Sequence, residues 1–277
     1  MAINTSTNRF SANTLTGFYN TFSLDNSGQN TMLSAAQLDD YSNEGYVFVP
    51  ELLPVDNISA VMTQLPELCA LERPEVIFEK NSQTVRSLMN VHTYSEAADK
   101  LIRNPLITDP VKQILGSDVY VFQCVLNLKR AFTGDIWQWH QDFSTYLIDD
   151  GMPANRLVNV LIFMDEVNEF NGPLMLVPGS HRGEAIKNDV DDTTTSYPIR
   201  ALDNSRVASA VELKGMVAPK GPAGSVIFAN TNIIHGSASN MSPWDRALIS
   251  LTLNSVENKH HGSSRPDWVV MNNFSPV

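Results

Sequence analysis

The part of the chain that begins at residue 119 is a succession of short apolar runs divided by turn-forming residues. The runs are 119–128 (VYVFQCVLNL), 157–163 (LVNVLIF), 174–177 (LMLV), 225–228 (SVIF) and 247–253 (ALISLTL). Glycine, proline and asparagine gather between them, at 169–173 (EFNGP), 178–180 (PGS) and 219–224 (PKGPAG). Several short strands separated by turns of this kind predict a β-sandwich or a jelly roll.

Residues before 119 follow a helical pattern for the most part. Ser34 and Gln37 have the spacing of a capping box, which predicts a helix that ends at Gly45. Further helices are predicted from Asp56, from Ser95 and after Pro110, and a strand is predicted over 46–49 (YVFV). Helices early and strands late predict an α+β, mainly β fold in which N-terminal helices flank one sheet face.

The sequence shows no internal repeat and no linker, so we expect a single domain over 1–277. Within it, 119–255 is expected to be the jelly-roll core. Residues 1–30 are rich in Asn, Ser and Thr and carry scattered aromatic residues. We expect them to form a loosely ordered arm that packs on the body through those aromatic side chains.

Charge and composition restrict the partners of the chain. The formal net charge is −11, and the longest run of basic residues is Lys129-Arg130. This pattern argues against binding to nucleic acid or to an anionic membrane surface. No apolar run has the length of a membrane span, and the N-terminus lacks the features of a signal peptide. We therefore expect a cytoplasmic monomer or homodimer that acts on a small molecule.

The residues with the strongest chemical meaning are His140 and Asp142, which form a His-x-Asp motif, and His235 farther along the chain. Two imidazoles and one carboxylate are the facial triad of non-haem Fe(II) oxygenases, which leaves open positions on the metal. Residues two apart on a strand point to the same face, so both members of the motif are expected to reach one ion. A lone His-x-Asp is more often a surface pair, but Trp139 and Phe143 flank this one as a pocket wall would.

Arg246 opens an apolar run eleven residues after His235. An arginine in that place either caps a strand end in solvent or binds a carboxylate through two hydrogen bonds. A dicarboxylic 2-oxo acid that chelates iron has a far carboxylate for Arg246 to bind, and Ser237 offers a further hydroxyl donor. The sequence therefore predicts an oxygenase that uses Fe(II), 2-oxoglutarate and O2, with His140, Asp142 and His235 as both metal ligands and catalytic residues.

A longer set of motifs surrounds these residues between about 79 and 253. The set comprises 85–92 (VRSLMNVH), Gln123-x3-Asn127-Leu-Lys129, 132–134 (FTG), 139–146 (WHQDFSTY), 150–153 (DGMP), 171–181 (NGPLMLVPGSH) and 235–237 (HGS) followed by Arg246. In order and spacing it resembles the phytanoyl-CoA dioxygenase superfamily of Fe(II)/2-oxoglutarate oxygenases, and most of all the ectoine hydroxylase branch.

The resemblance implies a double-stranded β-helix, that is, a cupin-like jelly roll, with His140, Asp142 and His235 as iron ligands. It implies that Arg246 and Ser237 bind 2-oxoglutarate and that Gln123 and Asn127 line the co-substrate pocket. Two positions depart from the branch. Val125 stands where ectoine hydroxylases carry an arginine for the substrate carboxylate, and Tyr146 stands in place of tryptophan.

These departures leave the substrate open. Candidate substrate residues are Trp137, Tyr146, Val125, His92 and Arg86. The polar span 183–209 is either a lid or a plain surface excursion. We expect hydroxylation of a small polar, amino-acid-derived metabolite, for instance in natural-product biosynthesis, with dealkylation or demethylation where the hydroxylated carbon adjoins nitrogen. The alternatives are a non-catalytic jelly-roll binding protein and a cupin-type metal enzyme that does not use 2-oxoglutarate.

Overall fold

A computed structural model describes residues 31–277, and these form one compact unit. Its largest element is a seven-stranded antiparallel sheet with the strand order β1-β8-β6-β10-β4-β3-β2. The strands are β1 (Tyr46–Val49), β2 (Val76–Phe78), β3 (Val85–Met89), β4 (Val119–Lys129), β6 (Leu157–Phe163), β8 (Val226–Asn230) and β10 (Arg246–Ser255). Strands from before residue 119 therefore join the predicted core at both edges of this sheet.

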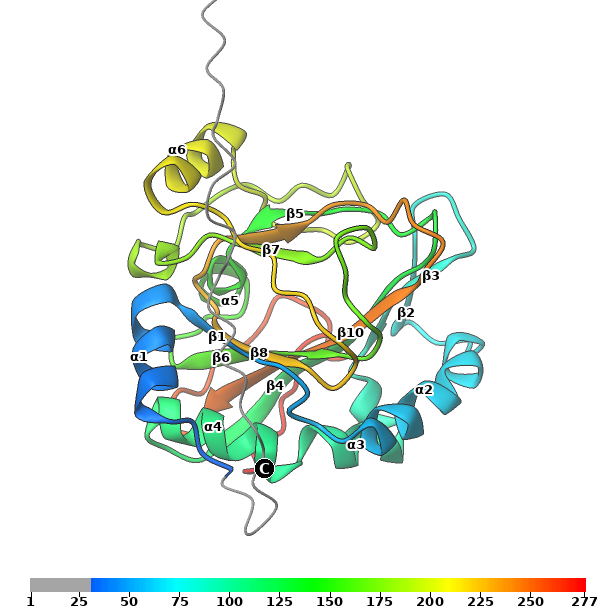
Figure 1. The fold of residues 1–277 in the computed structure, drawn as a ribbon, viewed down its shortest axis with the longest axis horizontal. Coiled ribbons are helices and arrows are strands. Elements are labelled where there is room, and N and C mark those ends of the chain that lie inside the picture. The colour runs from blue at the N-terminus through cyan, green and yellow to red at the C-terminus, as the bar shows by residue number, and fades with distance from the viewer. Residues whose placement is uncertain (1–30) are drawn as a thin grey trace, which may run out of the picture. The chain divides into compact units, whose positions relative to one another are not determined.

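A smaller sheet with the order β5-β9-β7 lies opposite the large one (Figure 1). Its strands are β5 (Trp137–His140), β7 (Leu174–Leu176) and β9 (His235–Ser237). Leu174 and Leu176 of this sheet pack with Leu161, Phe163 and Leu248 of the large sheet in one buried apolar cluster. Two sheets closed over such a cluster make the predicted jelly roll, and the fold class is confirmed.

Helices cover the other face of the large sheet. These are α2 (Val55–Cys69), α3 (Glu96–Ile102) and α4 (Pro105–Leu115), whose apolar side chains share a buried cluster with the large sheet (Figure 1). Helix α1 (Ala35–Glu44) begins with the predicted capping box of Ser34 and Gln37 and ends at Gly45, whose φ of 83° suits glycine. The remaining elements are α5 (Asp142–Asp149), α6 (Asn204–Lys214), η1 (Val91–Thr93) and η2 (Ser180–Arg182).

Alternation along the central strands decides what faces the gap between the sheets. On β4, Cys124, Leu126 and Leu128 pack in the cluster under the helices, whereas Gln123, Val125 and Asn127 line a cavity on the opposite face. Because the helices already bury one face, the other face is free to carry polar groups. The functional residues of β4, β6 and β10 all project to that second face.

Several sequence expectations need correction or fall outside the structure. The fourth helix begins at Pro105, with Asn104 as its N-cap, and Pro110 lies inside it rather than before it. The signal was an Asn-Pro pair, which suits a helix start because proline lacks the amide that would be unpaired there. The predicted arm over 1–30 lies outside the described residues. Within 31–277, no helix is both long and apolar enough to cross a membrane.

Candidate metal centre and active-site cavity

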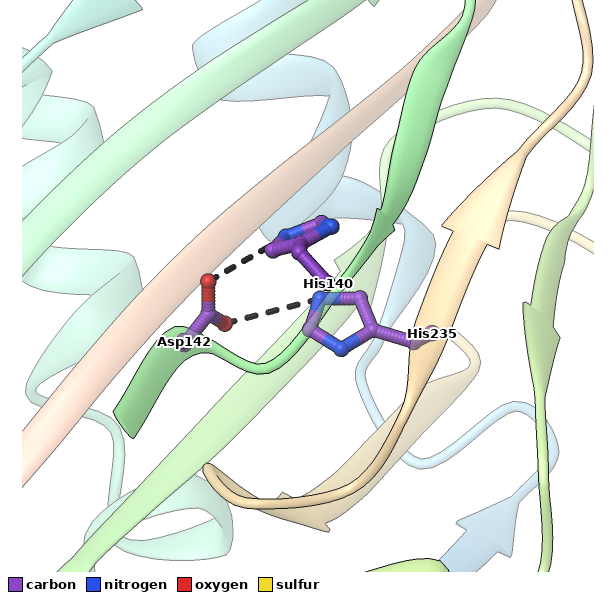
Figure 2. A group of neighbouring side chains, drawn as sticks. All are labelled: His140, Asp142 and His235. Carbon is purple, nitrogen blue, oxygen red and sulfur yellow. Dashed lines mark ion pairs between the residues drawn. The ribbon is translucent and has the colours of Figure 1, made fainter. Parts of the chain in front are cut away.

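Three side chains of the predicted triad converge at one end of the smaller sheet (Figure 2). His140 ends β5, His235 begins β9, and the two residues are register partners. The Oδ1 atom of Asp142 lies 3.3 Å from His140 Nε2, and its Oδ2 atom lies 3.5 Å from His235 Nε2. Asp142 is the first residue of α5, so the expectation that it shares a strand with His140 is wrong. The turn from strand to helix at Gln141 brings the carboxylate to the same point.

Backbone carbonyls orient both imidazoles. The Nδ1 atom of His140 lies 2.6 Å from the carbonyl oxygen of Gln138, and Nδ1 of His235 lies 3.0 Å from that of Ile233. A carbonyl only accepts, so each Nδ1 carries the proton and each Nε2 keeps its lone pair for a ligand. The lone pairs of both Nε2 atoms are therefore available on the side where Asp142 lies.

The ionisation of the cluster also suits a divalent cation. Burial alone raises the pKa of the Asp142 carboxyl, but His235, His140 and a hydrogen bond from Asn159 outweigh it and hold the pKa well below its usual range. Burial, followed by the proximity of His140, lowers the pKa of His235 to about 4. At neutral pH the site thus offers a carboxylate and a neutral imidazole, the forms that bind metal.

A cavity of about 480 Å³ opens from these three residues. Its lining includes Arg246, Ser237, Gln123 and Asn127, the four residues predicted for the co-substrate. Arg246 is 2% exposed and donates from Nη2 to the carbonyl oxygen of Gly172 at 2.7 Å. Its Nε and the hydroxyl of Ser237 are buried and have no hydrogen-bond partner among the described residues. Unpaired buried donors are costly, and a carboxylate seated between them would satisfy both.

Lys129 is a second buried basic residue beside Arg246, with which it is paired in register. Its Nζ donates to the carbonyl oxygens of Asp135 at 2.6 Å and Ala238 at 2.7 Å. Burial, and then the charges of Arg246 and Arg86, lower the pKa of Lys129 to about 6. The sequence reasoning quoted Lys129 as part of a motif but gave it no role. Its place at the end of a strand that carries Gln123 and Asn127 was the available signal.

The comparisons with known proteins agree with this geometry. The family model described as phytanoyl-CoA dioxygenase (PhyH) matches residues 41–248. An ectoine dioxygenase of Bordetella bronchiseptica is 36% identical over 252 residues, which cover 86% of this chain and 82% of that protein. The chain belongs to the phytanoyl-CoA dioxygenase family. The resemblance stated from the sequence is thereby confirmed, and with it the expectation of an oxygenase.

Two further relatives of this dioxygenase carry different names. An L-proline trans-4-hydroxylase of Streptomyces griseoviridis is 33% identical over 251 residues, covering 86% of this chain and 92% of the relative. EctD from S. alaskensis, whose crystal structure was determined with 2-oxoglutarate and 5-hydroxyectoine, is 30% identical in sequence to this chain. The TM-score between the two structures is 0.78, over 91% of this chain and 88% of that one. Another structure of the same protein contains bound Fe.

The cavity of this dioxygenase is also lined by three of the predicted substrate residues, namely Trp137, Tyr146 and Val125. Sequence reasoning missed four others there: Tyr197, Arg200, Arg265 and Trp268. Arg265 is bound to the fully buried Asp150 through Nε at 2.9 Å and Nη2 at 2.5 Å. Arg200 is bound in the same two-pronged way to Asp149, at 3.0 and 2.5 Å. The sequence does not reveal this pairing, because Asp149 and Asp150 are adjacent while Arg200 and Arg265 lie far along the chain.

Two of the predicted substrate residues of this dioxygenase, Arg86 and His92, are not among the residues that line the cavity. Arg86 is 1% exposed, forms an ion pair with Glu79 at 2.8 Å, and stacks on the ring of Trp137 with its guanidinium carbon 4.1 Å from the ring centre. It supports the cavity wall from behind. His92 is buried in η1, among the residues that pack under the helices.

The segment 183–209 forms part of the cavity wall, so the interpretation as a plain surface excursion is wrong. Val190 and residues 196–200 line the cavity. The amide of Leu202 donates to the carbonyl of Trp139 at 2.7 Å, and Gln138 Nε2 donates to Asp191 at 2.7 Å. Helix α6 begins at Asn204 within this span and was not predicted. The polar segment is thus attached directly to β5, the strand that carries His140.

Proposed function

We propose that this protein is an Fe(II)- and 2-oxoglutarate-dependent dioxygenase that hydroxylates a small amino-acid-derived zwitterion. The proposal rests on one cavity that contains two sets of groups, one suited to a metal ion and the other to a carboxylate. His140, Asp142 and His235 form a three-ligand cluster at its centre. Arg246 Nε and the Ser237 hydroxyl, both buried and unpaired in the described structure, lie along the same wall.

The assignment of the co-substrate follows from charge and shape. Iron bound by the three ligands would supply open positions for a chelating 2-oxo acid and for dioxygen. We assign the far carboxylate of 2-oxoglutarate to Arg246 and Ser237, with Gln123 and Asn127 beside it. Burial lowers the pKa of Arg246 only to about 10, so its guanidinium stays charged at neutral pH. Lys129 lies beside Arg246, but with its pKa lowered to about 6 it is mostly neutral at pH ~7, so Arg246 is the cation that binds this carboxylate.

The substrate end of the cavity favours a molecule of zero net charge. Each of the two arginines there is already balanced by an aspartate, in the pairs Arg265–Asp150 and Arg200–Asp149. A substrate carboxylate would bind the Nη1 of Arg265, the guanidinium nitrogen that Asp150 does not engage. Because the pairs leave no spare charge, that carboxylate must bring its own cation to avoid a buried net charge. The rings of Trp137 and Tyr197, whose centres lie 5.6 Å apart, suit a cationic nitrogen.

The replacement of the branch arginine by Val125 supports a substrate other than ectoine. Arg265 supplies a cation to the cavity from a different part of the chain, so the carboxylate is expected at a different place relative to the metal. The overall reaction consumes 2-oxoglutarate and O2 and yields succinate, CO2 and a hydroxylated substrate. Where the new hydroxyl group lies on a carbon next to nitrogen, the product loses that carbon fragment. Such a step suits the tailoring of an amino-acid-derived natural product.

The test has a binding arm and a turnover arm. Anaerobic addition of Fe(II) and then 2-oxoglutarate should produce the visible metal-to-ligand charge-transfer band. Aerobic incubation with candidate zwitterions should then release succinate, and release should depend on the substrate. Asp142→Ala should abolish both signals, because it removes one of three ligands. Absence of the band in the native protein would overturn the proposal and favour a cupin-type enzyme without 2-oxoglutarate.

The non-catalytic alternative makes the opposite prediction. A jelly-roll binding protein would bind the same zwitterions without succinate release, and Asp142→Ala would leave that binding unchanged. The intact ligand set argues for catalysis, because a carboxylate between two imidazoles is expensive to bury without a metal.

A further inference from the structure

Tyr146 is linked to the metal ligand Asp142 by an unbroken series of hydrogen bonds. The Tyr146 hydroxyl lies 3.1 Å from Thr252 Oγ1, and Thr252 Oγ1 donates to Asn159 Oδ1 at 2.8 Å. Asn159 Nδ2 then donates to Asp142 Oδ2 at 2.5 Å. Tyr146, Thr252 and Asn159 are 4%, 2% and 2% exposed, so water does not compete for these bonds. Tyr146 is also one of the two positions where the chain departs from ectoine-type sequences.

The number of protons that each group carries fixes which group donates in each hydrogen bond of this series. The carboxylate of Asp142 only accepts, so Asn159 must present its NH2 group to Asp142 and its carbonyl to Thr252. The single proton of the Thr252 hydroxyl is used in the bond to Asn159. The Tyr146 hydroxyl must therefore donate to Thr252, and it keeps its proton because burial raises its pKa well above the usual value. Every donor in the series points toward the metal ligand.

The series closes into a ring through α5. Tyr146 lies four residues after Asp142, so both side chains project from the same side of that helix. Thr252 and Asn159 are register partners on β10 and β6, two central strands of the large sheet. Helix α5 is therefore attached to the sheet at two points one turn apart. Together these two points fix the orientation of the Asp142 side chain at the start of the helix.

We propose that Tyr146 is a positioning residue for the metal ligand, acting through Thr252 and Asn159 to hold Asp142 Oδ2 on the protein and to leave Oδ1 for the metal. The inference rests on the proposed function, because it takes Asp142 to be an iron ligand. Oδ1 is the oxygen that lies 3.3 Å from His140 Nε2 and accepts no bond from Asn159. Without the ring, the carboxylate is free to rotate and to offer either oxygen.

The experiment measures metal binding alone, without 2-oxoglutarate or substrate. Co(II) is titrated anaerobically into the native protein, Tyr146→Phe and Thr252→Val, and its visible absorption is followed. Tyr146→Phe removes only the hydroxyl, and its ring keeps its packing on Phe122, 4.9 Å away between centres. Removing a partner behind a ligand weakens metal binding about 10- to 100-fold, so we expect about 3- to 10-fold from this more distant change, with an altered Co(II) spectrum.

Tyr120→Phe is the matched control. Tyr120 is fully buried, and its hydroxyl accepts a hydrogen bond from Asn254 at 2.8 Å, outside the ring that contains Asp142. This variant loses the same atom and a comparable hydrogen bond, so a general loss of stability would affect both variants alike. We expect Tyr120→Phe to bind Co(II) with native affinity and a native spectrum.

The double variant Tyr146→Phe/Thr252→Val tests whether the two hydroxyl groups act on Asp142 through one series of hydrogen bonds or independently of each other. If the bonds act in sequence, the double variant should bind Co(II) about as weakly as the weaker single variant. Native Co(II) affinity and spectrum in Tyr146→Phe, or additive losses in the double variant, would overturn the inference. Failure of the proposed function looks different, since the native protein would then give no charge-transfer band with Fe(II) and 2-oxoglutarate, whatever the Co(II) affinities of the variants.

Discussion

At the scale of single residues, chemistry alone indicated most of the site. His140, Asp142, His235 and Arg246 are residue types with few alternative uses in an apolar setting, so their order along the chain was informative. Arg265 carried no such signal, because its relation to the cavity depends on Asp150, more than a hundred residues earlier in the sequence. The contact exists only because the C-terminal segment returns to α5, and no local pattern encodes that return.

Arg265→Lys tests the substrate-binding role of this residue. Lysine keeps the positive charge beside the buried Asp150, but it cannot also present the second nitrogen of a planar guanidinium. A hydrogen bond to a charged group contributes about 1.5–3 kcal/mol, so the KM for the substrate found by succinate release should rise by about 10-fold or more. The KM for 2-oxoglutarate should stay unchanged, because Arg246 and not Arg265 is assigned to that co-substrate.

Arg156→Lys serves as the control for that substitution. Arg156 forms an ion pair with Glu257 at 2.6 Å, and both side chains are exposed, 38% and 63%. The same chemical change there should leave both KM values as they are. Equal effects of the two variants, or a rise in the KM for 2-oxoglutarate alone, would contradict the assignment of Arg265 to the substrate.

At the scale of elements, sequence patterns predicted the strands with apolar runs, β1 and β7 among them, and missed others, including β5 and β9. The strands β4, β6 and β10 are buried along nearly their whole length, so their apolar runs were unmistakable. The strands β5 (WQWH) and β9 (HGS) have four and three residues and contain no continuous apolar run. Helix α6 buries only Val207 and so lacks an apolar stripe. The proposed metal ligands His140 and His235 lie on β5 and β9, which is why the ligand motif was recognised before the strands that carry it.

Gly236→Ala tests how closely β9 must approach β5. A methyl group at Gly236 would lie 3.0 Å from the carbonyl oxygen of Trp137 and 3.2 Å from the amide nitrogen of Trp139, both backbone atoms of β5. The strands must move apart, and such overpacking costs about 1–3 kcal/mol. Since His140 and His235 are register partners across this pair, Co(II) affinity should fall together with the free energy of unfolding.

Gly183→Ala is the corresponding control. Its added methyl group would meet only the carbonyl oxygen of Ser180, at 3.4 Å, and its φ of −73° is one that alanine adopts freely. Denaturant unfolding and a Co(II) titration should leave this variant close to the native protein. Native metal affinity in Gly236→Ala would mean that the spacing of β5 and β9 does not control the ligand geometry.

At the scale of the whole molecule, the two faces of the large sheet have different roles within the described residues. Helices α2, α3 and α4 bury the apolar face, and this packing stabilises a fold whose other face holds Arg246, Lys129 and several buried polar side chains. The separation also explains why His92 does not line the cavity, since it belongs to the helix side. In that position His92 is expected to affect the stability of the fold independently of catalysis.

His92 should make the free energy of unfolding depend on pH. Burial lowers its pKa from 6.5 to about 4, with Asp99 opposing and Arg103 adding to the shift, and its Nδ1 has no hydrogen-bond partner among the described residues. The unfolded chain takes up a proton below pH 6.5 while the folded chain does not. Stability is therefore fully present above 6.5 and is lost as the pH falls toward 4, by about 2 kcal/mol between pH ~7.5 and ~5.

Urea unfolding of the native protein and of His92→Gln at these two pH values measures that contribution. His92→Gln removes the titrating group, so the loss of stability on acidification should shrink by about 2 kcal/mol relative to the native protein, whatever the variant's stability at pH ~7.5. Other groups, among them the metal-free His235, titrate equally in both proteins and cancel in the comparison. An identical pH dependence in the two proteins would show that His92 is protonated as easily in the fold as in the unfolded chain.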